Sequence, residues 1–240
     1  MDEIELRLNE IADEITLLKA ELQDKEKRLR ELEDIEDIKK LQCAYGYYLE
    51  RWMSREIIDC FSTSPEVSAT FVEGTYSGPE GVRRYFGRSS DQAPEFLHQV
   101  MQVSPVITVG PDGKRAKGRW YGYGSVAFRP YKGNIDPTIM SVVYEMEYIK
   151  EDGVWKILKL TLQMHYAYNT RRILGLADEN ESAAPADVKL SPDAWGEYNT
   201  TYPSGYIYPF SFVHPVTGEP TSESERNNKL NLKPNTFKPQ

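Results

Sequence analysis

Three side chains are candidates for proton-transfer chemistry: His98, Glu50 and Tyr45. The chain holds only three histidines, and His98 lies at the start of a predicted strand among apolar neighbours. An imidazole titrates near neutrality, so it can move a proton at neutral pH, and a carboxylate partner fixes its tautomer. We expect His98 to be a catalytic base. The alternatives are that His98 is a hydrogen-bonded core residue, or that His165 is the base instead.

Glu50 lies on a predicted helix whose other positions are largely apolar. A buried carboxylate without a partner is costly, so a carboxylate kept in such surroundings needs a role or a partner. We expect Glu50 to orient His98 or to act as the acid. The alternative is a surface ion pair with Arg51 or Lys39.

Two tyrosines of the same helix, Tyr45 and Tyr48, are three positions apart and therefore share a face. A phenol can polarise a carbonyl or protonate a leaving hydroxyl, and packing in an aromatic core is the alternative role. Glu50 lies about 140° around the helix from Tyr45. Both can reach one cavity only if the cavity lies beyond the helix end, or if the helix unwinds near Tyr48.

Further polar side chains interrupt apolar strand patterns. A pocket on a curved sheet needs a few such groups to hold a ligand. With Tyr48, the expected substrate-binding residues are Gln102, Arg119, Glu145 and His165. No sequence typical of nucleotide, zinc or serine-hydrolase sites occurs, so we expect neither a cofactor nor a metal.

The net charge of −8 is unevenly distributed along the 240 residues. Residues 1–35 hold 12 acidic and six basic side chains, which leaves 25 acidic and 23 basic for the remainder. A near-neutral body offers no basic field for nucleic acid. No apolar run of 18 residues and no signal peptide occur, so we expect a cytoplasmic protein without a membrane segment. Cys43 and Cys60 form no metal or disulfide pattern, and we expect both to be buried thiols.

The first 35 residues carry an apolar residue at alternating spacings of four and three, interrupted at Lys25. The members are Ile4, Leu8, Ile11, Ile15, Leu18, Leu22, Leu29 and Leu32. This pattern predicts a coiled coil, and its mix of Leu and Ile favours a homotrimer over a dimer or tetramer. The alternative is a helix packed back on its own body. After Ile35 the spacing changes, which predicts one helix from Asp2 to about Trp52 that passes from its partners to the core.

The remaining elements predict an α+β cone, a curved antiparallel sheet around helices, over residues 36–170. We expect a helix over 54–61 with Ser54 as its cap, a strand over 66–76 and a helix over 77–86. Tight turns at 110–113 and 151–153 separate strands over 96–109, 116–129, 138–150 and 154–168. Residues 171–240 form an aromatic, Pro-rich extension that we expect to pack on the body or on a neighbouring subunit, with a polar end from 219.

This order of elements resembles the SnoaL-like branch of the nuclear transport factor 2-like (NTF2-like) superfamily. The segments that carry the resemblance are 35–41 with Tyr45, 76–85 (YSGPEGVRRY), 97–99 (LHQ), 116–120 (AKGRW) and 148–157 (YIKEDGVWKI). Members fold as a curved sheet wrapped round helices with a deep pocket, and they include scytalone dehydratase, bile acid 7α-dehydratase and ketosteroid isomerase. Segments 202–210 and 214–218 are similar to extended members, such as a lyase that removes formaldehyde from lignin-derived diarylpropanes.

In the dehydratases of this family a helical tyrosine, an acidic residue five positions later and a strand histidine serve the chemistry. Tyr45, Glu50 and His98 correspond to them here. His98 lies seven residues before Pro105, whereas the bile acid enzyme has a spacing of five. The resemblance implies a cofactor-independent lyase that eliminates water or formaldehyde from a bulky, hydroxylated aromatic molecule. An isomerase or a non-catalytic ligand-binding or scaffold protein remains the alternative.

Overall fold

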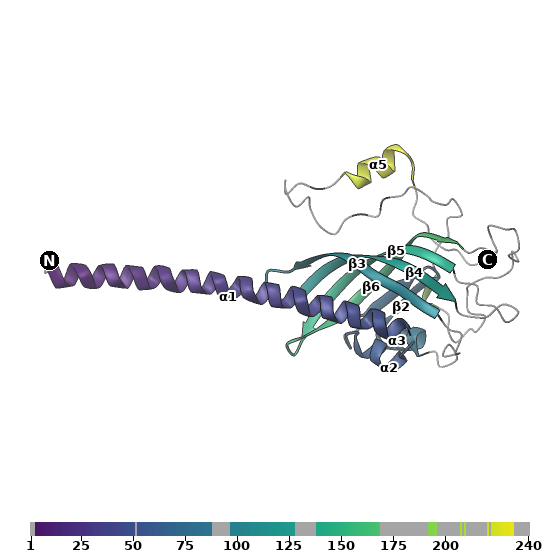
Figure 1. The fold of residues 1–240 in the computed structure, drawn as a ribbon, viewed down its shortest axis with the longest axis horizontal. Coiled ribbons are helices and arrows are strands. Elements are labelled where there is room, and N and C mark those ends of the chain that lie inside the picture. The colour runs from purple at the N-terminus through teal and green to yellow at the C-terminus, as the bar shows by residue number, and fades with distance from the viewer. Residues whose placement is uncertain are drawn as a thin grey trace, which may run out of the picture.

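A computed structural model describes residues 3–50, 52–87, 97–127, 138–168, 192–195, 207, 209, 220 and 222–232. Helix α1 (Glu3–Glu50) is continuous, as the sequence predicts, and its first half projects away from the body (Figure 1). The change of apolar spacing falls where the helix meets the sheet, because Asp34 is the first buried residue of α1 and Ile38 the next.

The end of α1 closes with a Schellman arrangement. The Met53 amide donates to the Tyr48 carbonyl and the Trp52 amide to the Leu49 carbonyl, each at 3.0 Å. Trp52 has a φ of 46°, the left-handed conformation that this motif requires after the last turn. The helix therefore stays intact through Tyr48 and Glu50 and does not unwind where the sequence left that open.

Two short helices follow, α2 (Ser54–Asp59) and α3 (Gly78–Phe86). The prediction that Ser54 caps α2 is wrong, since Met53 occupies the cap position and no side chain caps the helix. Ser54 already lies inside the helix, where its hydroxyl is not placed to accept from the next free amides.

The sheet has seven strands in the order β3-β4-β5-β6-β1-β2-β7 within the described residues. The long strands are β3 (Leu97–Val109), β4 (Arg115–Ala127), β5 (Thr138–Glu151) and β6 (Val154–Tyr168). They form the predicted antiparallel meander. The short strands are β1 (Ser68–Phe71), β2 (Gly74–Ser77) and β7 (Ala194–Trp195).

One expected strand, over 66–76, is in fact a hairpin. β1 pairs antiparallel with β2 and parallel with β6, so this hairpin extends the sheet beyond the meander. The turn between β5 and β6 follows the prediction: Asp152 and Gly153 have φ values of 49° and 81°, which is the type I′ combination for a two-residue hairpin.

The core lies between the second half of α1, the two short helices and one face of the curved sheet (Figure 1). From Tyr144 to Tyr148 on β5, buried side chains alternate with half-buried ones. Trp120 and Tyr144 pair across β4 and β5 on the face toward α1, which is called the inner face below. The arrangement confirms the predicted α+β cone.

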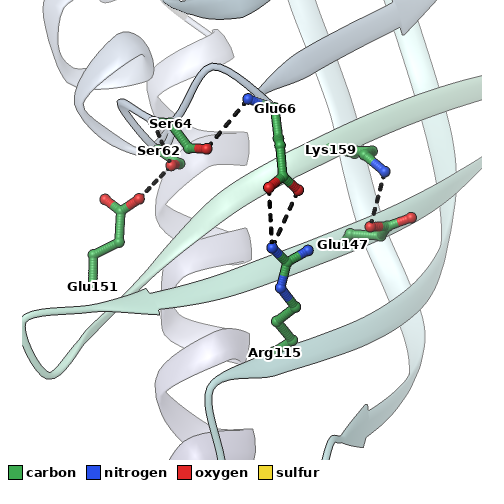
Figure 2. A network of polar contacts seen from close by, with 7 residues as sticks. All are labelled: Ser62, Ser64, Glu66, Arg115, Glu147, Glu151 and Lys159. Carbon is green, nitrogen blue, oxygen red and sulfur yellow. Dashed lines mark hydrogen bonds and ion pairs between the residues drawn. The ribbon is translucent and has the colours of Figure 1, made fainter.

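Polar contacts tie the segment after α2 to the strand ends farthest from His98 (Figure 2). Ser62 donates a hydrogen bond to Glu151, and the Ser64 amide donates to the Ser62 hydroxyl at 2.9 Å. Arg115 donates to Glu66 at 3.1 Å. These contacts close one end of the cone and leave His98 at the other.

The C-terminal part is described at a few positions. Helix α5 (Glu223–Lys229) lies above the sheet in Figure 1, so the polar end of the chain is partly helical. The Ile207 amide donates a hydrogen bond to Asn227 Oδ1 at 3.0 Å, and Asn227 Nδ2 donates to the Ile207 carbonyl at 2.6 Å. The segments 202–210 and 214–218 lie outside the described residues except at Ile207 and Pro209. The expected domains 1–35, 36–170 and 171–240 stay a prediction.

Within the ranges above, no helix combines the length and apolar character that crossing a membrane requires.

Candidate functional site

The inner site is built on a buried stripe of α1. Ile38, Gln42, Tyr45 and Leu49 follow one another at spacings of four and three, so all four point toward the sheet. Three of these side chains are fully buried and Leu49 is nearly so. Two polar groups in this apolar stripe thus enter the interior of the cone.

Tyr45 has its ring packed edge-on against Phe61 and Phe86, with centroids 5.9 and 6.2 Å away. Its hydroxyl is inaccessible to solvent and has no hydrogen-bond partner among the described residues. Burial, with smaller contributions from Tyr144 and other neighbours, raises the Tyr45 pKa well above its usual value. Tyr45 is therefore a protonated phenol at neutral pH, with a donor and an acceptor to offer to a ligand.

A chain of hydrogen bonds links α1 to three strands. The Trp120 indole donates to the Tyr148 hydroxyl at 3.0 Å, and that hydroxyl donates to Gln42 Oε1 at 2.6 Å. Gln42 Nε2 then donates to Gln102 Oε1 on β3. The chain stops there, since the solvent-shielded Gln102 Nε2 finds no acceptor in the described structure.

Sequence reasoning identified Gln102 but missed Gln42 and Tyr148. The available signal was the position of Gln42, a lone amide in the apolar stripe after Ile38. The spacing of glycines on β4 was a second signal. A Cβ at Gly118 would lie 2.9 Å from the Tyr148 ring, and one at Gly122 would lie 2.6 Å from the Tyr144 ring. These glycines make room for two inner-face tyrosines.

His98 lies on the same face of β3 as Gln102, four residues away. Its ring contacts Trp52 with centroids 6.0 Å apart, and its Nδ1 atom is shielded from solvent. Burial lowers the His98 pKa to about 4. The imidazole is therefore neutral above pH 5 and able to accept a proton.

The opposite, outer face of the sheet carries the other predicted polar residues. Arg119 and Glu145 form an ion pair of 2.7 Å, and Arg119 also donates to the Pro209 carbonyl at 2.9 Å. The His165 ring lies 5.8 Å from Tyr121. Burial lowers the His165 pKa, and the charge of Arg119 lowers it further.

The structure thus does not bring Arg119, Glu145 and His165 together with Tyr45 and Gln102. Strand register is the reason: Arg119 pairs with Glu145, whereas the inner-face residues beside them on these strands are one position away. A polar residue in an apolar strand does not say which face it is on when both faces are covered.

Glu50 and Tyr48 lie near the inner site but are not part of the buried stripe that contains Gln42 and Tyr45. Glu50 is the last residue of α1 and is half-buried. On an unbroken helix it points about 140° away from Tyr45, so the two are not partners on one face. Tyr48 is half-buried and packs against the core.

Two surface hollows are found elsewhere. One, of about 170 Å³, lies on the outer face between β4, β5 and β6, and the other, of about 300 Å³, lies between α2 and α3. Neither is lined by Tyr45, Gln102 or His98. The described residues contain no group of His, Cys, Asp and Glu side chains that could hold a metal ion.

Comparisons with known proteins agree with this arrangement. A family model, the SnoaL-like domain, matches residues 30–161, which contain all the segments on which the cone's resemblance rests. Two similar solved structures come from Novosphingobium aromaticivorans. One is provisionally named an aromatic ring hydroxylase (17% identity, 59% of this chain and 96% of that one, TM-score 0.49). The other is provisionally named a scytalone dehydratase (15% identity, 58% and 89%, TM-score 0.47).

A third structure is a hexachlorocyclohexane dehydrochlorinase, LinA type 3, from Novosphingobium barchaimii. It shares 21% identity, over 60% of this chain and 92% of that one, with a TM-score of 0.44. The three structures carry names for different reactions.

Proposed function

The chain belongs to the SnoaL-like family of the NTF2-like superfamily, and we propose that it is a cofactor-independent lyase that eliminates water or formaldehyde. Its substrate would be a bulky, hydroxylated aromatic small molecule. The family contains small-molecule-converting enzymes, including lyases, beside isomerases and non-catalytic members. The observation that carries the proposal is a pair of buried polar groups that have no hydrogen-bond partner among the described residues, the Tyr45 hydroxyl and Gln102 Nε2.

Buried polar groups in native proteins are nearly always hydrogen-bonded, and leaving one unpaired costs about 1–3 kcal/mol. Two such groups in one apolar interior support a ligand whose oxygen atoms complete them. The surrounding rings of Phe61, Phe86 and Trp52 favour an aromatic ligand. Hydroxyl or carbonyl oxygens on an aromatic skeleton meet both requirements.

In the proposed elimination of water, His98 accepts the proton from the carbon next to the one that bears the leaving hydroxyl. The electrons of the broken C–H bond form the new double bond, and the C–O bond breaks. Tyr45 gives its proton to the departing hydroxyl, which leaves as water, and the proton on His98 later restores Tyr45 through solvent. If formaldehyde leaves, His98 takes the proton of a hydroxymethyl oxygen, and the O–H electrons form the C=O bond of formaldehyde as the carbon–carbon bond breaks. The electrons of that bond take the Tyr45 proton and form a new C–H bond, and the proton on His98 restores Tyr45 through solvent.

Other predicted residues take smaller roles in this proposal. Gln102 holds a substrate oxygen, and Tyr48 bounds the site. Glu50 is proposed to influence the approach to His98 from the end of α1 rather than to touch the reacting atoms. His165 serves the outer face, because it lies with Tyr121 on the side away from α1.

An isomerase would need a carboxylate that shuttles a proton inside the cone. Among the described residues the buried acidic side chains are Asp34 and Glu223. Asp34 is already bound by Lys150 at 2.5 Å and by the Trp155 indole at 2.8 Å, at the junction of α1 with the sheet. This arrangement favours the lyase over the isomerase.

The test is a panel of hydroxylated aromatic compounds, including diarylpropane diols, incubated with the full chain. Mass spectrometry would detect loss of water or formaldehyde, and quenching of tryptophan fluorescence would detect binding. The lyase predicts turnover that His98→Asn abolishes and that His165→Asn leaves intact. Binding of panel compounds without turnover would support the ligand-binding alternative, and full activity in His98→Ala would exclude His98 as the base.

A further inference from the structure

The first half of α1 presents an apolar stripe that its own body does not cover. The eight members of the stripe, from Ile4 to Leu32, are between 46% and 67% exposed. At about 1.5 Å per residue, the part before Asp34 extends for about 45 Å. A single helix with so narrow an apolar stripe gains little stability alone, so this half of α1 needs a partner that packs against the stripe.

The stripe points away from the body. Ile38 faces the core and lies nine residues after Leu29, and nine steps of about 100° place the two side chains on opposite sides of α1. Cys43 lies two heptads after Leu29 and within about 40° of it. Cys43 is exposed, contrary to the sequence prediction, and so is Tyr47 nearby. Partner helices could therefore continue along α1 without meeting the sheet.

We propose that the occupant of this stripe is further copies of the same chain, in a parallel, in-register, three-stranded coiled coil. One core position holds Leu8, Ile15, Leu22 and Leu29, and the other holds Ile4, Ile11, Leu18, Lys25 and Leu32. Leu at three of the first positions, with Ile at two of the second, favours more than two strands. The bodies then radiate outward from the axis, each on the far side of its own helix.

The charges beside the stripe fit parallel helices. In that orientation Glu14 lies against the partner's Lys19, and Arg28 lies against the partner's Glu33, so each interface holds two attractive pairs. If the helices were antiparallel, with their apolar residues packed against each other, Lys19 would lie against the partner's Lys19 and Glu21 against the partner's Glu21. The attractive pair in that arrangement would be Glu14 with the partner's Arg28.

The parallel arrangement also explains the interruption at Lys25. It brings Glu21 near the partner's Glu26, which alone would repel. Lys25 lies between them at a core position and reaches outward to Glu21 of its own helix, with Nζ 2.7 Å from the carboxylate. One cation per helix thus offsets two carboxylates in this layer.

The oligomeric state of the full chain tests the proposal. Sedimentation equilibrium or native mass spectrometry should give three times the mass of the chain. Ile15→Asn combined with Leu22→Asn should dissociate it into monomers. Leu17→Asn is the matched control, since Leu17 is 72% exposed but lies off the stripe. All four tryptophans follow residue 35, so tryptophan fluorescence shows whether the body stays folded in each variant.

Disulfide cross-linking tests the orientation. With Cys43→Ser as background, Ile15→Cys should give covalent dimers on mild oxidation, because parallel helices place position 15 beside its equivalent. Leu17→Cys in the same background should not. In the unaltered chain, Cys43 should cross-link as well. A monomer at micromolar concentration, a trimer that survives the double variant, or no cross-link through Ile15→Cys would overturn the proposal.

Discussion

The predicted polar residues on the two faces of the sheet differ in whether they have partners. On the outer face, Arg119 and Glu145 pair with each other across neighbouring strands, 2.7 Å apart. On the inner face, Tyr45 and Gln102 each keep one buried polar atom without a partner in the described structure. On the outer face the charged groups are paired, although the amide oxygen of Gln163 is also buried without a partner in the described structure. We propose that the functional site lies on the inner face, where Tyr45, Gln102 and His98 gather.

Substitution of His98 should have the largest effect. Asn keeps a polar group of similar size but cannot accept a proton, so we expect His98→Asn to lower kcat about 10²- to 10⁴-fold. The measurement is steady-state turnover of whichever compound the panel identifies. On the outer face, His165→Asn should change kcat less than about threefold, and an equal loss in both variants would remove the distinction between the faces.

Acidification should lower the stability of the fold through His98. The His98 pKa falls from 6.5 to about 4 on folding. As the pH falls, His98 therefore takes up its proton in the unfolded chain before it does so in the folded chain. The free energy of unfolding is unaffected by His98 titration above pH 6.5 and decreases between pH 6.5 and 4. Allowing for partial exposure, we expect a loss of about 2 kcal/mol in the free energy of unfolding.

Urea unfolding of the chain and of His98→Gln over this pH range isolates the contribution of the imidazole. The variant should lack this part of the slope. A wild-type chain with the same slope as the variant would show that His98 stays solvated.

Tyr45→Phe removes one hydroxyl from the inner face. Because this hydroxyl is buried without a partner in the described structure, its removal relieves the cost of desolvating it, and we expect the free energy of unfolding to rise by about 1–3 kcal/mol. Activity should fall about 10- to 100-fold, since the proposed donor to the leaving group is lost. Tyr121→Phe on the outer face is the control. A marked loss of stability in Tyr45→Phe would indicate a structural role.

Arg119→Met should separate stability from activity on the outer face. It leaves Glu145 without its ion-pair partner, and we expect a loss of about 2 kcal/mol because Glu145 keeps some contact with water. Activity per folded molecule should stay near that of the wild type. Adding Glu145→Met should recover part of the stability, as measured by urea unfolding. A fall in kcat without destabilisation would instead place Arg119 in the functional site.

Glu50→Gln should have the smallest effect. Glu50 is half-buried at the end of α1 and points away from Tyr45, so we expect kcat to change less than about threefold. Turnover against pH in this variant is the measurement. A loss comparable to that of His98→Asn would restore the predicted partnership between Glu50 and His98.

The sequence by itself determined much of this protein. Apolar spacing predicted α1 and the place where it meets the sheet, and turn residues such as Asp152 and Gly153 predicted the meander. These features depend on neighbours in the chain, whose geometry a local pattern contains. The scarcity of histidine made His98 a candidate base, and the ordered segments identified the family.

The tertiary structure decided which polar residues meet. Gln42, Gln102 and Tyr148 come from three elements, and only packing shows that they form one chain of hydrogen bonds. The face on which Arg119 lies depends on register with β5, because a shift of one residue would exchange inner and outer side chains. The sequence predicted Tyr45 as a site residue, and the packing around it showed the feature that supports that role, a buried hydroxyl without a partner in the described structure.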